Sequence, residues 1–173
     1  MGLRVIGAKR ASGFLGALRA GFAAVVLALM AGGAQAACDA GRVDLRGDWG
    51  SARFVVEIAD TPETRAQGLM FVEEMPSRAG MLFVFPDERM RSFWMRNTLI
   101  SLDIIYFDET GAWVSAQENA VPLDETSLPS DGPAQYVLEI NAGLVERFGM
   151  GAGTEIRHPV IDRDRAAWPC DAD

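Results

Sequence analysis

The 173-residue sequence carries 24 acidic and 16 basic residues, for a formal net charge of −8 at pH 7, and its length fits a single domain. This acidic balance predicts that nucleic acid and anionic lipid are not partners, because binding to either depends on Lys and Arg side chains that neutralise phosphate.

Residues 1–36 have the pattern of a secretory signal peptide. Basic residues precede an uninterrupted apolar or small run over residues 20–34, which is shorter than the roughly 20 residues of a spanning helix. The run ends in Ala34-Gln35-Ala36, a small-x-small cleavage pattern. We therefore expect cleavage after Ala36, a single globular domain over residues 37–173 that is periplasmic or secreted, and no membrane insertion afterwards. The alternative is an uncleaved membrane anchor.

Cleavage would remove four basic residues and no acidic ones, which leaves 12 basic and 24 acidic residues and a net charge of −12. The two cysteines, Cys38 and Cys170, stand at the ends of the mature chain. In an oxidising compartment they predict a disulfide that closes a loop of about 130 residues, worth ~4–5 kcal/mol in the chain-entropy model. A metal pair or a redox couple are the alternatives, but there is no CxxC spacing and only one histidine.

The first half of the domain predicts a strand, a helix and a second strand. Residues 37–51 are rich in Gly and Asp and are expected to be irregular, whereas residues 53–59 are rich in Val, Ile and Phe and predict a strand. A short helix follows, with Thr61 as N-cap, Pro62 at the first helical position and Gly68 as the stop. A turn over residues 76–80 leads to a short buried strand over residues 81–85, ended by Pro86.

The second half predicts mainly strands. Strands over residues 92–95 and 102–108 flank a polar turn, and a hairpin turn leads to a strand over residues 112–117. Residues 121–133 concentrate Pro, Ser, Asp and Gly and predict an exposed loop.

The last predicted elements are a strand over residues 134–140, a short helix over residues 142–148 capped by Asn141 and closed by Gly149, and a strand over residues 154–161. The pattern indicates a β-dominated α+β fold: a compact, antiparallel, barrel-like single domain with two short helices.

Few residues could carry catalysis. His158 is the only histidine, and no serine-nucleophile, zinc-protease, calcium-loop or phosphate-loop motif occurs. We therefore expect no cofactor and no metal, and we lean against an enzyme. Six methionines fall in the mature chain; thioethers could bind Cu(I), but without a repeated Met-x-x-Met spacing, core packing is the favoured role.

The densest chemistry lies in SFWMRNTLISLDIIYFD, residues 92–108. Strand alternation places Asp103 among apolar residues, so it needs a partner, and Arg96 is the nearest candidate. Two interpretations stay open: an internal Arg96–Asp103 ion pair, or a pocket with an aromatic wall and convergent polar groups. The candidate pocket residues are Arg65, Trp94, Arg96, Asn97, Thr98, Asp103 and Glu139.

The stretches FVVEIADTPETRAQGLM, GMLFVF, FWMRNTLISLDIIYFD and VLEINAG resemble the bacterial and archaeal family called domain of unknown function 192, over about residues 53–158. The resemblance implies a β-rich, barrel-like fold, frequently behind a signal peptide, and no established activity. Family members often have a basic residue after GLM and Pro before LD, where this chain has Phe71-Val72 and Ser101.

These observations lead to three hypotheses for the function. The first is an exported domain that binds a small polar ligand or an envelope protein at the Trp94–Asp103 patch, with Arg96 as the charge-assisted donor. The second is a hydrolase of envelope polymers whose Asp103 and Glu139 carboxyls lie about 5–10 Å apart across an open cleft. The third is a purely structural envelope module without a pocket near Trp94.

Overall fold

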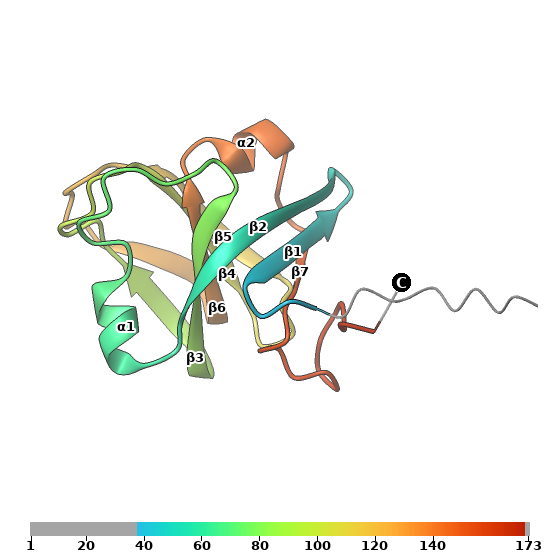
Figure 1. The fold of residues 1–173 in the computed structure, drawn as a ribbon. Coiled ribbons are helices and arrows are strands. Elements are labelled where there is room, and N and C mark those ends of the chain that lie inside the picture. Colours follow the sequence, from blue (N-terminus) through green and yellow to red (C-terminus); the bar gives the residue numbers. More distant parts are fainter. Residues whose placement is uncertain (1–37, 172–173) are drawn as a thin grey trace, which may run out of the picture. The chain divides into compact units, whose positions relative to one another are not determined.

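The computed structural model describes residues 38–171, so the expected signal peptide lies outside the described residues. One mixed sheet of seven strands dominates it, in the order β5-β4-β6-β3-β2-β1-β7, and it curls into a half-barrel (Figure 1). The elements are β1 (Arg42–Gly47), β2 (Gly50–Ala59), α1 (Pro62–Gln67), β3 (Ala79–Phe93), β4 (Leu102–Phe107), β5 (Trp113–Ala120), β6 (Leu128–Asn141), α2 (Leu144–Phe148) and β7 (Glu155–Arg157).

The predicted fold class is confirmed: the domain is β-dominated, with two short helices. Five of the six named strand pairings are antiparallel. The exception is β2 with β3, which run parallel from Val55 opposite Ala79 to Ala59 opposite Phe83. Parallel neighbours need a crossover connection, and here α1 and the loop over residues 68–78 supply it.

Alternation along the strands divides the apolar side chains between two clusters. In β4, Ile105 and Phe107 join a cluster with β1, β2 and α2, whereas Ile104 and Tyr106 join a second cluster with residues of β3 and the loops beside α1. This split is the one that the alternation of residues 102–107 predicts. Every residue of β4 is buried, because β4 lies between β5 and β6 and both of its faces are covered.

The first helix forms as the sequence predicts. Thr61 is the N-cap and accepts a hydrogen bond from the backbone N–H of Thr64, Pro62 occupies the first turn, and Gly68 is the C-cap with a positive φ of 51°. No residue of α1 is buried, so this six-residue helix depends on its caps and on the chain that flanks it.

The local predictions for the segments that form β1, β3 and β6 were wrong. Residues 42–47 form β1 rather than an irregular segment, because Val43 and Leu45 alternate with polar residues and fill the core. Pro86 does not end a strand: β3 continues to Phe93, and its register with β6 shifts between Val84 and Arg89, which accommodates a residue that has no N–H to donate. β6 likewise begins at Leu128, inside the predicted loop.

The second helix is closed by Gly149, as predicted, but Asn141 is not its cap. The N-cap is Gly143, which makes no side-chain capping bond. The Asn141 amide instead donates to the carbonyls of Met75 and Pro76, so it holds the loop that precedes β3.

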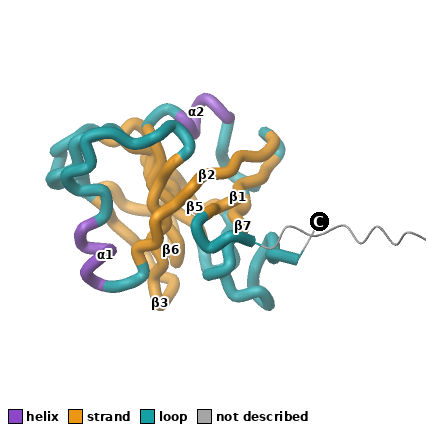
Figure 2. The backbone as a smooth tube through the Cα atoms, in the orientation of Figure 1, coloured by secondary structure: helices purple, strands orange, loops and turns teal. Residues whose placement is uncertain are grey.

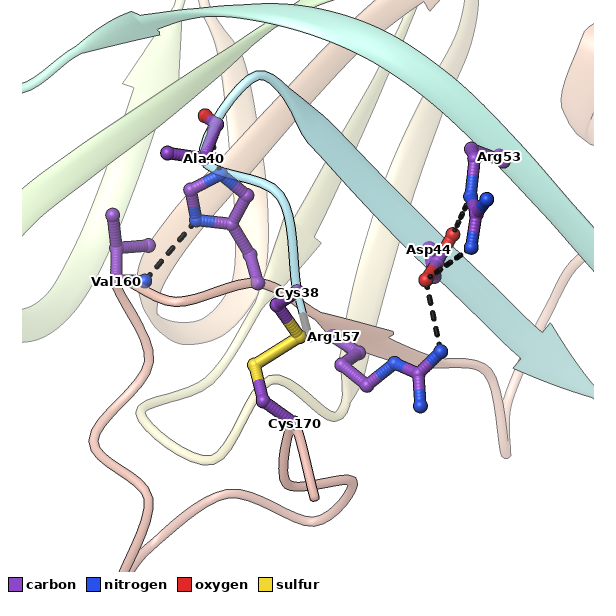
Figure 3. The surroundings of a disulfide bond; sticks show 8 residues. Cys38, Ala40, Asp44, Arg53, Arg157, Val160 and Cys170 are labelled. Carbon is purple, nitrogen blue, oxygen red and sulfur yellow. Dashed lines mark hydrogen bonds and ion pairs between the residues drawn. A yellow bond between two sulfur atoms is a disulfide. The ribbon is translucent and has the colours of Figure 1, made fainter. Parts of the chain in front are cut away.

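The predicted disulfide is present. Cys38 and Cys170 are bonded, with Cα atoms 5.4 Å apart and a sequence separation of 132 residues (Figure 3). It ties the segment before β1 to the tail after β7. Within residues 38–171, no helix is long and apolar enough to cross a membrane.

Candidate functional site

Three loops converge at the end of the sheet where the FWMRNT segment turns (Figure 2). The segment over residues 94–101 is bonded to the loop after α1 by the Phe71 N–H, which donates to the Asn97 carbonyl over 2.9 Å. It is bonded to the loop over residues 121–127 by the Met95 N–H, which donates to the Asp124 carbonyl over 2.8 Å. Asn97 and Phe71 both have a positive φ, so this end of the fold is built from tight, specified turns.

Asp103 is not a member of this site. It is fully buried, and its carboxylate accepts the backbone N–H of Asn119 and that of Val145, each over 2.9 Å. The second bond caps the start of α2, the role that the sequence assigned to Asn141. The predicted Arg96–Asp103 ion pair is therefore wrong, because two backbone amides satisfy this carboxylate on the face of the sheet that packs against α2.

Glu139 lies on the other face. In the ladder between β4 and β6, Asp103 is opposite Ile140 and Ile104 is opposite Glu139, so the two carboxylates point to opposite sides of one sheet. The hydrolase arrangement, with both carboxyls across one open cleft, is therefore wrong. Glu139 instead joins the face that carries Phe83 and Tyr106.

Glu139 lines a small cavity, here called the inner pocket, with a volume of about 40 Å³. This is room for about one water molecule or one ligand hydroxyl group. The other lining residues come from α1, the loop after it, β3 and the FWMRNT segment: Arg65, Ala66, Gln67, Gly68, Leu69, Met70, Phe83, Phe93, Trp94, Arg96 and Thr98.

The Glu139 carboxyl has no hydrogen-bond or ion-pair partner among residues 38–171, although only 5% of the residue is exposed. Burial raises its pKa from 4.5 to about 8, so the neutral acid dominates at neutral pH. Tyr106 lies on the same face of the sheet, but its O–H donates to the Leu128 carbonyl over 2.6 Å. Burial, together with the negative charge of Glu139, also raises the pKa of Tyr106.

Two arginines border the inner pocket and behave differently. Arg65 is held by its own fold: its guanidinium donates to the carbonyls of Asp60 and Val84 over 2.5 and 2.8 Å and lies 5.2 Å from the centre of the Phe85 ring. Arg96 is exposed, and its guanidinium lies 5.5 Å from the centre of the Trp94 ring. Arg96 is therefore the cation at this site that is accessible to a ligand.

A larger depression, here called the outer groove, adjoins the inner pocket and shares Arg65, Ala66, Phe93 and Trp94 with it. Its volume is about 560 Å³, and Phe85, Ser92, Glu125 and Ser127 complete its lining. Trp94 is 47% exposed. An open groove of this size that leads to a narrow polar recess is a form suited to a small ligand.

The structure thus brings together five of the seven predicted site residues. Arg65, Trp94, Arg96, Thr98 and Glu139 line the inner pocket. Asp103 lies in the core on the opposite face.

Asn97 holds the turn rather than lining the pocket, because its side-chain amide lies 3.8 Å from the Met70 sulfur.

Sequence reasoning predicted an aromatic wall with Trp94 but missed Phe93. Phe93 lines both cavities, and its ring centre lies 4.9 Å from that of Phe83 and 5.9 Å from that of Tyr106, each in an edge-to-face arrangement. The only available signal was its place beside Trp94. It also missed Ser92 and Ser127, whose hydroxyls lie 2.7 Å apart across the outer groove, because pairing of β3 with the start of β6 is not visible in either segment alone.

Within residues 38–171, no three or more His, Cys, Asp or Glu side chains gather in a way that could hold a metal ion. His158 is buried; it contacts the Ala40 carbonyl through Nε2 over 2.9 Å and accepts the Val160 N–H at Nδ1. Met81 and Met95 are core residues, in keeping with a packing role for methionine.

Comparison with known proteins places these features in a family. The model of the family DUF192 (domain of unknown function 192), described as an uncharacterized ACR, matches residues 43–158. Curated proteins gave no match. A protein of unknown function from Novosphingobium aromaticivorans DSM 12444 is similar in structure, with a TM-score of 0.65 and 43% identity over 66% of this chain and 82% of that one. A candidate transcription regulator from Sinorhizobium meliloti 1021 is similar too, with a TM-score of 0.65 and 38% identity over 69% of this chain and 94% of that one.

Proposed function

Because the chain belongs to the DUF192 family, whose description gives no activity, we propose a function from the site itself: the domain binds a small hydroxylated ligand of the sugar or polyol class. One ligand hydroxyl occupies the inner pocket against Glu139, and the rest of the ligand lies in the outer groove against Trp94. The observation that carries this proposal is the buried Glu139 carboxyl, which has no partner among residues 38–171 and lines the inner pocket.

The protonation state of Glu139 suits a hydroxyl group. With its pKa raised to about 8 by burial, the side chain is mostly a neutral acid at pH 7 and can both donate and accept a hydrogen bond. A hydroxyl has the same double capacity, so one ligand O–H would satisfy a group that the fold leaves without a partner. Buried polar groups are nearly always satisfied, and a perturbed carboxyl in a cleft is typical of functional sites.

The surroundings of Glu139 favour a neutral ligand group in the inner pocket. A ligand ammonium there would meet the guanidinium groups of Arg65 and Arg96, which line the same recess. A ligand carboxylate there would lose its hydration in a recess of about 40 Å³, and this desolvation disfavours the charged form. An acidic substituent fits better at the rim, where Arg96 is exposed.

Trp94 supplies the apolar part of the recognition. Its half-exposed indole offers a flat face to the C–H groups of a sugar ring, and the guanidinium of Arg96 beside it limits its movement. The serine hydroxyls of Ser92 and Ser127 lie in the same groove and can bond further hydroxyls of the ligand.

We also propose that the domain works outside the cytoplasm. The signal-peptide pattern of residues 1–36 and the Cys38–Cys170 disulfide both support an oxidising compartment. Edman or mass-spectrometric sequencing of the protein from a periplasmic fraction is expected to give Ala37 as the first residue. A cytoplasmic protein that retains residues 1–36 would contradict export.

The similar structure from Sinorhizobium meliloti 1021 is described as a candidate transcription regulator, and that description applies to that protein. The charge of this chain argues against carrying it over, because the 12 arginines outside residues 1–36 are outnumbered by 24 acidic residues and DNA binding requires a basic surface.

A thermal-shift screen of monosaccharides, sugar acids, amino sugars and polyols tests the proposal. A sugar that raises the Tm of the wild type is expected to lose most of its effect on the Glu139→Gln and Trp94→Ala variants, and to keep it on Arg89→Gln, since Arg89 is an exposed residue that lines neither cavity. If no compound shifts the wild type, or the hits shift all four proteins equally, the structural-module hypothesis is the better account.

A further inference from the structure

A second feature, separate from the Glu139 site, is a groove rich in arginine at the β1–β2–β7 corner of the sheet. Its volume is about 580 Å³, and it is lined by Asp44, Arg46, Arg53, Arg78, Arg157 and Trp168, among others. It shares no lining residue with the inner pocket or the outer groove. Outside residues 1–36 the chain has 12 arginines and 24 acidic residues. Four of those arginines line this groove.

Strand register explains the cluster. Val43 and Leu45 of β1 point into the core, so Asp44 and Arg46 point outward. Across the ladders, Asp44 is opposite both Arg53 of β2 and Arg157 of β7. Adjacent strands therefore place several guanidinium groups on one small surface.

Two of these guanidinium groups already hold an oxyanion. Arg53 and Arg157 each donate through Nη2 to the same oxygen of Asp44, Oδ2, over 3.1 and 3.0 Å, as Figure 3 shows. Burial alone would raise the pKa of Asp44, but the hydrogen bonds from Arg53 and Arg157 outweigh it and hold the pKa below its usual value. The corner of the sheet is thus built to stabilise negative charge.

Trp168 fixes a wall of the groove. The guanidinium groups of Arg46 and Arg157 lie 4.5 and 4.1 Å from the centre of its ring, which buries the indole and orders both arginines. The indole N–H is buried and has no acceptor among residues 38–171. Trp168 stands two residues before Cys170, so the disulfide to Cys38 anchors the segment that carries it.

The arginines of the groove differ in their contacts with carboxylates. Arg46 is paired with Glu155 over 2.8 Å, and Asp44 is shared by Arg53 and Arg157. Arg78 is exposed and has no carboxylate partner within residues 38–171; its guanidinium lies 4.9 Å from the centre of the Phe148 ring. Arg78 is thus the guanidinium group in this groove that is most open to an added anion.

We propose that this groove binds the phosphate group of a small, soluble phosphorylated compound. Arg78 and the remaining N–H groups of Arg46 and Arg53 bond the phosphate oxygens, because the planar guanidinium matches a tetrahedral oxyanion. The compound is a small solute rather than a membrane or a polyanion, because the net charge of −12 for residues 37–173 repels extended anionic surfaces.

Isothermal titration calorimetry with inorganic phosphate at low ionic strength tests this proposal, with sodium chloride of matched ionic strength as the reference. Phosphate is expected to bind the wild type with an affinity that falls as salt is added. The Arg78→Gln variant is expected to bind it about tenfold more weakly, the size of one charge-assisted hydrogen bond. Arg89→Gln is the matched control, because Arg89 is an exposed arginine outside the groove, and it is expected to bind as the wild type does.

Far-UV circular dichroism checks that each variant is folded, and Arg53→Gln provides an independent second variant in case Arg78→Gln is not. The proposal is overturned if the wild type responds to phosphate no more than to chloride, or if the folded groove variants bind phosphate as tightly as Arg89→Gln does. Vesicles of phosphatidylglycerol form the last arm. Binding to them without binding of inorganic phosphate would contradict a soluble phosphate compound.

Discussion

Asp103 and Glu139 lie on opposite faces of the same pair of strands: Asp103 is opposite Ile140, and Glu139 is opposite Ile104. Asp103 accepts two backbone N–H groups, whereas Glu139 accepts none from the described residues. Asp103 therefore stabilises the fold, whereas the side chain of Glu139 lines the inner pocket without a partner among the described residues.

The first prediction concerns Asp103. Replacing it with Ala leaves the N–H groups of Asn119 and Val145 without acceptors inside the protein, so we expect a loss of about 3 kcal/mol in the free energy of unfolding, measured by urea denaturation. Arg96→Ala is expected to change it by less than about 0.5 kcal/mol, because Arg96 is exposed. A double-mutant cycle between Asp103 and Arg96 should give a coupling energy near zero. A coupling energy above about 1 kcal/mol would instead support an Arg96–Asp103 ion pair.

The second prediction concerns the pH dependence of stability. The pKa of Glu139 is raised from 4.5 to about 8 in the folded protein, so the folded state binds more protons than the unfolded state between these values. Stability from this group is therefore fully present below about pH 4.5 and is lost as the pH rises to about 8. The free energy of unfolding is measured by denaturation at about pH 5 and at about pH 9. From the lower to the higher pH, we expect the wild type to lose on the order of 4 kcal/mol more of it than Glu139→Gln does.

The comparison between the two proteins is needed because His158 also titrates. Burial lowers its pKa, so its contribution to stability increases as the pH rises toward 6.5, the opposite direction to Glu139. Equal losses in wild type and Glu139→Gln would show that Glu139 does not have a raised pKa.

The third prediction concerns Gly80, where β3 passes close to β6. A Cβ atom at this position would lie 2.4 Å from the Glu139 carbonyl oxygen and 3.1 Å from Cγ2 of Ile140. We expect Gly80→Ala to destabilise the fold by about 1–3 kcal/mol, because the backbone must shift. Gly151→Ala is the control, since nothing lies within 4 Å of a Cβ there, and it should stay within about 1 kcal/mol of the wild type. Thermal unfolding of both variants tests this prediction. Equal stabilities of Gly80→Ala and Gly151→Ala would contradict the close approach of β3 to β6 at Gly80.

The fourth prediction concerns the disulfide. The Cys38→Ser/Cys170→Ser double variant is expected to lose about 2–5 kcal/mol, because the bond closes a separation of 132 residues. Reductant should lower the Tm of the wild type toward that of the double variant and leave the variant unchanged. If the wild-type Tm stays the same after the disulfide has been reduced in denaturant and the protein refolded, the bond contributes little to stability.

Local signals in the sequence predicted the parts of the fold that depend on local chemistry. Thr61, Pro62 and Gly68 specify α1 by themselves, and alternation along β4 correctly divides its side chains between two faces. Strand β1 was missed because Gly and Asp surround two core residues, and the continuation of β3 past Pro86 depends on a register shift against β6 that neither strand shows alone.

The sequence indicated which residues gather at the FWMRNT turn, but not how they are arranged. The polar residues around the FWMRNT turn indicated a site, and five of the seven do line one pocket. Which face Glu139 occupies relative to Asp103 depends on the pairing of β4 with β6, strands separated by 20 residues between Phe107 and Leu128. A backbone amide partner for Asp103 could not be distinguished from Arg96, because both satisfy a buried carboxylate.

The central claim is that Glu139 is a neutral acid that meets a ligand hydroxyl, and a ¹³C NMR titration of its side-chain carboxyl carbon tests it most directly. The resonance is assigned by its absence in Glu139→Gln and followed with pH in the free protein and with a saturating sugar from the thermal-shift screen. We expect an inflection near pH 8 in the free protein, as the raised pKa of about 8 requires, and a displaced inflection in the complex. An inflection near the ordinary value of 4.5, or a titration that the sugar leaves unchanged, would contradict the claim.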